Sequence, residues 1–323
     1  MFRARAYLKD GSVEMDLSVE QVREIIQDSK NEVWIDIEDI NPDDVAFLRD
    51  DLKIHQIAVE EVLSPLERPE IQTFENHILL VLHAPSPSLE KGGMDTIEID
   101  FLVGNNFIVT VRSGPIASVK DMEDRVRANP RIMSRGCDFM LYFMSDAMVD
   151  DYLPILNALD KRIDTIQETA VKNPTRETSS DLMKLKADIL EIRRATGPQF
   201  EVLRRLTGGY TDIIEPGLAV YFRSVCEHLQ QVNSQLDMFR EEVNSTVQVC
   251  LAIKSDQLNE VMKVLAIIAV IMMPLTLITG VFGMNFYFPD WVQKSALAWW
   301  LTGGVMAALG LGLFAYFKRK KWL

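Results

Sequence analysis

The chain has 323 residues, of which 48% are apolar and 25% charged, and its formal net charge at pH 7 is −13. This balance excludes a disordered or collagen-like chain. Residues 260–323 carry six bases and two acids, whereas residues 1–259 carry 28 bases and 45 acids. An acidic body followed by a basic, apolar tail excludes a nucleic-acid binder and a simple soluble enzyme.

Residue types that often bind metals or react in active sites are scattered along the chain. Cys137, Cys226 and Cys250 lie far apart without a C-x-x-C motif, which indicates reduced thiols in the cytosol. The four histidines form no H-E-x-x-H motif. The charged segment Met1–Asp16 has no apolar core, so we expect no signal peptide.

Strand and helix patterns alternate over residues 1–112 and predict an α/β domain. Helices are predicted over Ser18–Ser29 and Pro42–Leu52, the second capped by Asn41. Ala84–Gly93 is rich in Pro, Ser and Gly and predicts a loop. The predicted strands are Phe2–Leu8, Val33–Ile37, Ile78–His83, Ile97–Val103 and Phe107–Arg112. Because no glycine-rich phosphate-binding motif is present, a nucleotide-dependent enzyme is not expected.

From about Ile116 the pattern changes to long helices. They are predicted over Ile116–Asn129, Asp138–Lys172 and Thr175–Thr207, and Asn173–Pro174 separates the last two. Acid-rich helices of this kind are typical of solvated, packed hairpins. We therefore divide the cytoplasmic part into an α/β domain (1–130), a helical hairpin (131–216) and a stalk (217–258).

The stalk belongs to a much longer predicted helix. From Leu218 to Thr279 there is no glycine and one proline, Pro274, and a helix of this length extends over about 93 Å. Helices of globular domains are rarely this long, whereas the helices of coiled stalks reach this length. Apolar residues alternating four and three apart form a heptad seam: Val225, Leu229, Val232, Leu236, Phe239 and Val243.

A second stripe follows the same rhythm on this helix and is small or polar through most of its length. We call it the polar stripe: Glu241, Ser245, Gln248, Ala252, Ser255, Asn259, Met262, Ala266, Ala269, Met273, Thr276 and Gly280. Within a membrane such a stripe must face protein or water. It predicts a pore lining if several copies surround an axis. Close helix packing through small residues is the alternative.

Two uncharged runs, 264–289 and 295–317, each exceed the roughly 20 residues that a transmembrane helix needs. They predict a membrane domain over 259–323. Its first span covers about 262–282, its outer loop 283–294, its second span about 295–317 and its basic tail 318–323. A buried hydrophobic hairpin of a soluble protein is the alternative.

The flanking residues of this hairpin predict its orientation. Lys263 and the cluster Lys318–Lys321 lie at the same end, so both termini are expected in the cytoplasm. Trp299, Trp300 and Trp322 are suited to the membrane interfaces. Gly304, Ala308 and Gly312, four apart, predict a small-residue packing face on the second span.

The first span ends in Gly283-Met284-Asn285. Here the sequence closely resembles the CorA family of divalent-cation channels, whose signature is Gly-Met-Asn in this position. The similarity extends over most of the chain. It includes Asn259–Leu265, Met273–Thr276, Gly283–Phe286, the basic run before Trp322, and the segment His55–His83 with its Arg68-Pro69 and Phe74–His77.

The resemblance implies an α+β/α membrane protein that assembles as a funnel-shaped homopentamer. The cytoplasmic α/β domain lies at the far end, the long helix lines funnel and pore, and the second span forms an outer ring. The implied activity is passive influx of hydrated Mg²⁺ across the cell inner (plasma) membrane, gated by intracellular Mg²⁺. Co²⁺ and Ni²⁺ are further candidate ions.

The resemblance also implies roles for single residues. Gly283, Met284 and Asn285 are the expected selectivity filter, in which Asn285 binds the ion through ion-bound water. Lys318, Arg319, Lys320 and Lys321 are the expected basic collar of the inner mouth. The expected pore lining, which adds a gating leucine just off the polar stripe, is Gln248, Asn259, Met262, Leu265, Ala266, Ala269, Met273, Thr276 and Gly280.

Mg²⁺ chemistry agrees with such a lining. Mg²⁺ holds octahedral oxygen ligands and loses water reluctantly, and neither span carries a carboxylate that would strip it. Asn285 amides and Gly283 carbonyls are expected to accept hydrogen bonds from the ion's water; for Asn285 the alternative is a turn-former with positive φ. Met262, Leu265 and Met273 are suited to apolar constrictions that close by dewetting.

Two departures from the family concern regulation. Gln248 stands where family members commonly carry an aspartate, and Ser224 aligns with an aspartate that binds regulatory Mg²⁺ between subunits. Glu90 and Asp95 are guesses for the partner acid. Two other functions stay open. One is a ZntB-like zinc transporter of the same fold, and the other is a membrane-anchored cytoplasmic sensor that transports nothing.

Overall fold

The structure is a computed structural model that describes residues 1–64, 68–86, 96–209, 211–284, 296–320 and 322. Contacts divide these residues into two compact units. The first comprises Met1–Ala170 and Thr175–Val247, and the second comprises Val171–Pro174 and Gln248–Leu323.

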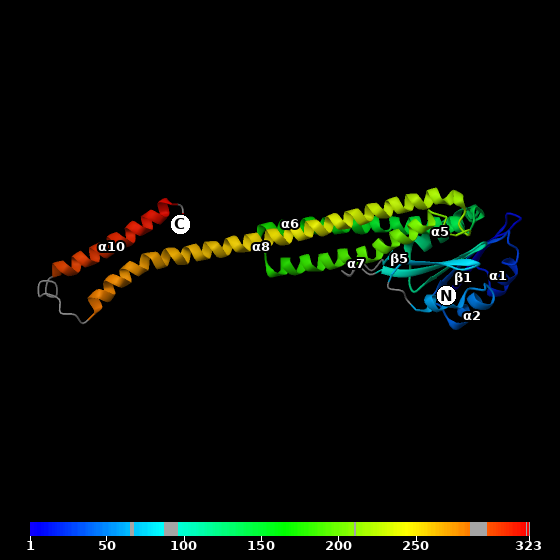
Figure 1. Cartoon of the computed structure of the whole chain (residues 1–323), viewed down its shortest axis with the longest axis horizontal. Helices are drawn as coiled ribbons and strands as arrows, with labels where there is room; N and C mark the ends of the chain where they lie inside the picture. The colour runs from blue at the N-terminus through cyan, green and yellow to red at the C-terminus, as the bar shows by residue number, and fades with distance from the viewer. Residues whose placement is uncertain (65–67, 87–95, 210, 285–295, 321, 323) are drawn as a thin grey trace. The chain divides into compact units, whose positions relative to one another are not determined.

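The first unit is built on a seven-stranded sheet of order β2-β1-β3-β7-β6-β5-β4 (Figure 1). Its strands are β1 (Phe2–Tyr7), β2 (Val13–Glu14), β3 (Glu32–Glu38), β4 (Glu70–Thr73), β5 (His77–Pro85), β6 (Thr96–Gly104) and β7 (Phe107–Arg112). β3 and β7 run parallel, with Ile35 opposite Val109. The other neighbouring strands pair antiparallel.

Helices pack on both faces of the sheet, and its strands are therefore buried. Alternate strand residues, such as Ile35, Leu79 and Val109, form a core with α1 (Val19–Ile25), α2 (Pro42–Asp50) and α3 (Gln56–Leu63). On the other side α5 (Cys137–Asp150) contacts β3, β5, β6 and β7, and α4 (Ala117–Ala128) packs against α5. The 3-10 helix η2 (Pro130–Arg135) joins α4 to α5.

The five predicted strands and both predicted helices of residues 1–112 are present; Phe107–Arg112 has the predicted ends and the other elements have shifted ends. Asn41 caps α2 as predicted, because its side chain accepts from the N–H groups of Asp43 and Asp44. The first predicted helix ends at Ile25 rather than Ser29. The predicted loop begins later than Ala84, because β5 includes Pro85, and residues 87–95 lie outside the described residues.

The prediction of one helix over Asp138–Lys172 is wrong. The structure has α5 ending at Asp150 and α6 (Tyr152–Lys172) beginning after a turn at Asp151. Pro154 explains the break: it has no N–H to donate to the Asp150 carbonyl, so a continuous helix would lose a bond at this level.

Two long helices complete the first unit and lead into the second. α7 (Arg176–Leu206) is capped by Thr175 and matches the helix predicted over Thr175–Thr207 to within one residue at each end, and α8 (Ala219–Gly283) follows the short 3-10 helix η3 (Pro216–Leu218). The six residues of the predicted heptad seam are each at most 4% exposed. The prediction of an apolar seam on the first half of α8 is therefore confirmed.

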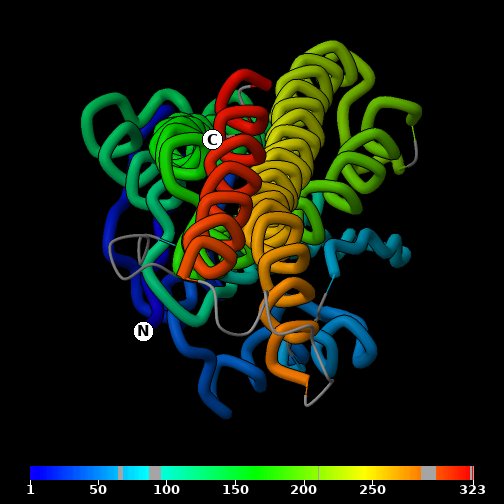
Figure 2. Tube along the Cα trace, turned by 90° about the vertical axis from the view of Figure 1, so that its left-hand side faces the viewer, coloured from blue at the N-terminus to red at the C-terminus, as the bar shows by residue number. Residues whose placement is uncertain are grey.

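In the second unit, α10 (Ala296–Arg319) lies alongside the C-terminal part of α8 (Figure 2). Both helices are long and apolar enough to cross a membrane. Ile267 and Phe317 are buried between them, and Leu275 lies 3.8 Å from the space that a Cβ on Gly310 would occupy. The two predicted spans are thus present as helices that pack as a hairpin.

Candidate functional site

The polar stripe is exposed along its whole length in the single chain. All twelve residues, from Glu241 to Gly280, are exposed, and Met273 reaches 77%. Asn259 and Thr276 are among the exposed residues in the apolar part of α8. Placing their polar groups in hydrocarbon without hydrogen-bond partners would cost free energy. The stripe therefore needs protein or water beside it, and the chain's own described residues do not provide that cover.

The stripe also lies on the side of α8 away from its own packing partners. At 100° per residue, its membrane part is turned by about 150° from the residues of this part of α8 that are at least half-buried, which are Lys263, Ile267, Ile271, Pro274, Leu275 and Ile278. Its cytoplasmic part is turned by about 160° from the heptad seam. Helix packing within one chain thus leaves a continuous small and polar face free for further copies or for water.

Thr276 has a hydroxyl group prepared to accept hydrogen bonds. Its Oγ1 donates to the Met272 carbonyl at 2.8 Å, so the proton is committed to the helix backbone and the lone pairs remain available. Thr279 makes a similar bond to the Thr276 carbonyl at 3.0 Å. An acceptor on the polar stripe, such as Thr276, suits the bound waters of a cation, because those waters are strong donors.

The outer end of α8 carries only part of the predicted filter within the described residues. Gly283 ends the helix and Met284 follows it, 51% exposed. A Cβ added at Gly280 or Gly283 would meet no atom within 4 Å, so both positions border open space. Asn285, the residue predicted to bind ion-bound water, lies outside the described residues.

The opposite end of the hairpin carries the residues predicted to form the basic collar. Lys318, Arg319 and Lys320 are exposed at the end of α10, and Lys321 lies outside the described residues. Trp322 stacks on Phe317 with ring centroids 5.8 Å apart, and the Lys263 Nζ lies 5.9 Å from the Trp322 ring. The basic tail and the base of the first span therefore meet at one end of the hairpin.

Among the described residues, no group of three or more His, Cys, Asp or Glu side chains is arranged to hold a metal ion. Ser224 and Gln248, the two departures from the family pattern, are both exposed on α8. Glu90 and Asp95 lie outside the described residues. The described part of the single chain thus provides exposed surface at these positions but no preformed cation site.

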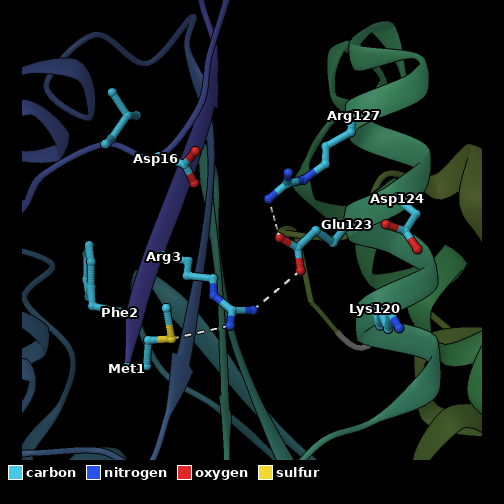
Figure 3. A pocket seen from close by; sticks show the side chains of 9 residues that line it. Met1, Phe2, Arg3, Asp16, Lys120, Glu123, Asp124 and Arg127 are labelled. Carbon is cyan, nitrogen blue, oxygen red and sulfur yellow. Dashed lines mark hydrogen bonds and ion pairs between the residues drawn. The ribbon is translucent and has the colours of Figure 1, made fainter.

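A pocket of about 600 Å³ lies between β1 and α4 and has no relation to the polar stripe (Figure 3). The Glu123 carboxylate accepts from Arg127 at 2.9 Å, from Arg3 at 3.4 Å and from the buried Arg5. Burial raises the pKa of Glu123, but the three arginines outweigh it and the pKa is lowered. These paired charges hold β1 to α4 rather than present a free reactive group.

The small-residue face predicted on the second span does not pack within the single chain. Gly304, Ala308 and Gly312 are exposed, and the face of α10 that packs on α8 is the opposite one, so packing of the small residues on other copies stays a prediction. That face consists of the residues that are at least half-buried: Ala298, Thr302, Met306, Gly310, Leu313 and Phe317. Their spacing of four and three was visible in the sequence, but the stronger small-residue pattern obscured it.

Comparisons with known proteins agree with the resemblance found in the sequence. The family model described as "CorA-like Mg2+ transporter protein" matches residues 29–319. The chain is 33% identical over 336 residues to the cobalt/magnesium transport protein CorA of Thermotoga maritima, an alignment that covers 98% of this chain and 94% of that protein.

Two solved structures share the fold. The CorA magnesium transporter from Methanocaldococcus jannaschii superposes with a TM-score of 0.86 at 20% identity, covering 100% of this chain and 99% of that one. The cytoplasmic domain of ZntB from Vibrio parahaemolyticus reaches 0.61 at 14% identity, covering 70% of this chain and 88% of that one. At these identities the likeness concerns the fold alone.

Proposed function

Because the chain belongs to the CorA-like Mg²⁺ transporter family, we propose that it forms a homopentameric channel for passive Mg²⁺ influx across the cell inner (plasma) membrane. Both termini lie in the cytoplasm, and Co²⁺ and Ni²⁺ are further ions for the same route. The first half of each α8 forms the stalk, and the second half lines the pore with α10 outside it.

The observation that carries this proposal is the polar stripe. It continues without a break from Glu241 to Gly280, it is exposed throughout, and it lies opposite the face that α10 covers. A helix that only anchors a cytoplasmic domain has no use for such a face inside the membrane. Five copies around an axis turn the same face into a lumen that excludes lipid.

The proposed lumen suits a hydrated ion. Mg²⁺ keeps its inner waters because their removal is costly, and the lining provides acceptors for those waters rather than carboxylates that would replace them. Asn285 and the Gly283 carbonyl act at the outer entrance, and Thr276 and Asn259 continue the path. Met262, Leu265 and Met273, all more than half exposed in the single chain, form apolar rings that close by dewetting.

Regulation follows from charge. Residues 1–259 carry 45 acids and 28 bases, so neighbouring cytoplasmic bodies repel one another unless cations screen them. We propose that intracellular Mg²⁺ reduces this repulsion, holds the subunits together and closes the pore. The basic collar at Lys318–Lys321 sits at the inner mouth and rejects cations until the pore opens.

The test is Mg²⁺ entry into liposomes that contain the purified protein and a Mg²⁺-sensitive dye. We expect influx with the native chain, loss of influx with Asn285→Ala, and native influx with Asn157→Ala, an exposed asparagine of α6. Zn²⁺ influx without Mg²⁺ influx would assign the ZntB-like activity instead. No flux of any divalent ion would leave the membrane-anchored sensor as the function.

A further inference from the structure

Three polar contacts tie α7 to α8 in a single antiparallel register. The Thr196 hydroxyl donates to Asn233 Oδ1 at 2.6 Å. Arg193 lies 3.5 Å from the Asp237 carboxylate, and Lys186 Nζ donates to Asn244 Oδ1 at 2.9 Å. Each contact is one or two helical turns from the next on both helices, so a slip of one turn would break all three.

The contact at Asn233 is buried, unlike the other two. Asn233 is 8% exposed and Thr196 is fully buried. The Asn233 amide is satisfied on both sides: Oδ1 also accepts from Arg193 Nη1 at 3.2 Å, and Nδ2 donates to the Thr196 carbonyl at 3.3 Å. Any other register would leave this amide buried without partners, which is costly. A buried asparagine of this kind fixes register in coiled helices.

An independent feature of α7 lies at the same level. Gly197 and Pro198 stand together inside a 31-residue helix, although they are the two residue types least suited to a helix interior. Gly197 has a steric reason, because a Cβ there would lie 2.5 Å from Arg193 Nη1. Its absence lets the Arg193 guanidinium cross to Asn233. Pro198 cannot donate to the Arg194 carbonyl, which weakens α7 beside the buried contact.

We propose that Arg193, Thr196 and Asn233 are positioning residues that fix the register of α8 against α7, and with it the position of the polar stripe along the helix axis. α8 is one helix from Ala219 to Gly283, so a shift of the helix at Asn233 shifts the stripe as well. The weak point at Gly197-Pro198 gives α7 the freedom to follow such a shift. This role rests on the proposed function, since the stripe matters only if it lines the pore.

Cysteine cross-linking in the full-length protein tests the register directly. Cysteines replacing Lys186 and Asn244 report the native register, and cysteines replacing Lys186 and Arg240 report a slip of one turn. The native cysteines Cys226 and Cys250 are buried, as is Cys137. With Asn233 present, we expect a short bismaleimide to link only the first pair.

In Asn233→Leu we expect the second pair to become linked as well and Mg²⁺ influx into liposomes to fall. Ser234→Leu, an exposed neighbour, is the matched control and should behave as wild type. Gly197→Ala displaces Arg193 while favouring the helix, so it folds even if Asn233→Leu does not; we expect the same changes, smaller.

Each outcome decides the proposal. Exclusive linking of the first pair in both test variants would overturn it, and so would reduced influx with an unchanged cross-link pattern, which indicates a purely structural role. Absence of Mg²⁺ influx in the wild-type chain would refute the proposed channel instead. The cross-link pattern does not depend on transport, so the two failures are distinguishable.

Discussion

Asp100 is a buried carboxyl group whose protonation should control the stability of the sheet. It lies on β6, is 4% exposed, and its Oδ1 has no hydrogen-bond partner among the described residues. Burial, then the charges of Glu98 and Glu61, raise its pKa from 3.8 to about 8. Folding therefore favours the protonated form. Stability is unaffected below pH 3.8, falls as pH rises toward 8 and levels off above it.

The size of the effect follows from the raised pKa. One pKa unit corresponds to about 1.4 kcal/mol, so the Asp100 cost grows from about 2 kcal/mol at pH 5 to about 5 kcal/mol at pH 8. Asp100→Asn removes this dependence. We expect the free energy of unfolding of the variant, relative to wild type, to rise by about 3 kcal/mol over this range.

The assay is urea unfolding of the full-length protein in detergent, followed by the fluorescence of Trp34. Trp34 is fully buried on β3 and its Nε1 donates to Thr110, so it reports on the sheet once the other four tryptophans are replaced by phenylalanine. Asp124→Asn, at an exposed carboxyl of α4, is the control. Parallel pH profiles for wild type and Asp100→Asn would refute the reasoning.

Three further predictions use the same protein. Burial and the charge of His55 lower the pKa of His77 to about 4. The free energy of unfolding of wild type, relative to that of His77→Gln, should therefore fall by about 3 kcal/mol between pH 6.5 and 4, and an unchanged difference in urea titrations would contradict this. Leu236→Ala in the heptad seam should lower the free energy of unfolding by about 3 kcal/mol. Met238→Ala, at a side chain that is 51% exposed, should lower it by less than about 1 kcal/mol; similar shifts of the urea midpoint for both variants would contradict this. Thr276→Val should slow Mg²⁺ influx into liposomes more than Thr279→Val, and the reverse order would contradict the acceptor role.

Local signals predicted much of the fold. The Asn41-Pro42 start of α2 and the heptad seam were predictable because a cap and a period act within a few turns of one helix. α3 was missed because its cap is His55, whose Nδ1 accepts from Ile57 N–H, and histidine is not a usual cap. β4 was missed because a four-residue edge strand has too few positions to show alternation.

The partners of each face could not be predicted in the same way. The period of α8 indicates that two faces exist, but only the folded chain shows that one packs within the protomer while the other stays uncovered. The tie between Lys186 and Asn244 joins positions 58 residues apart, and nothing in either helix alone indicates the other. Asp100 was likewise unremarkable in the sequence, because its pKa is raised mainly by burial in the folded domain, with smaller contributions from Glu98 and from Glu61 on α3.

The heptad seam and the polar stripe lie on opposite sides of α8, and this limits which insertions and deletions the helix tolerates. One residue inserted between Val247 and Gln248 would rotate the stripe by about 100° relative to the seam, whereas seven would rotate it by only about 20°. Insertions and deletions within α8 should therefore survive selection in multiples of seven. Selection thus restricts the angle between the stripe and the seam more strictly than the length of α8. In the loops, by contrast, insertion or deletion of a single residue changes no such angle.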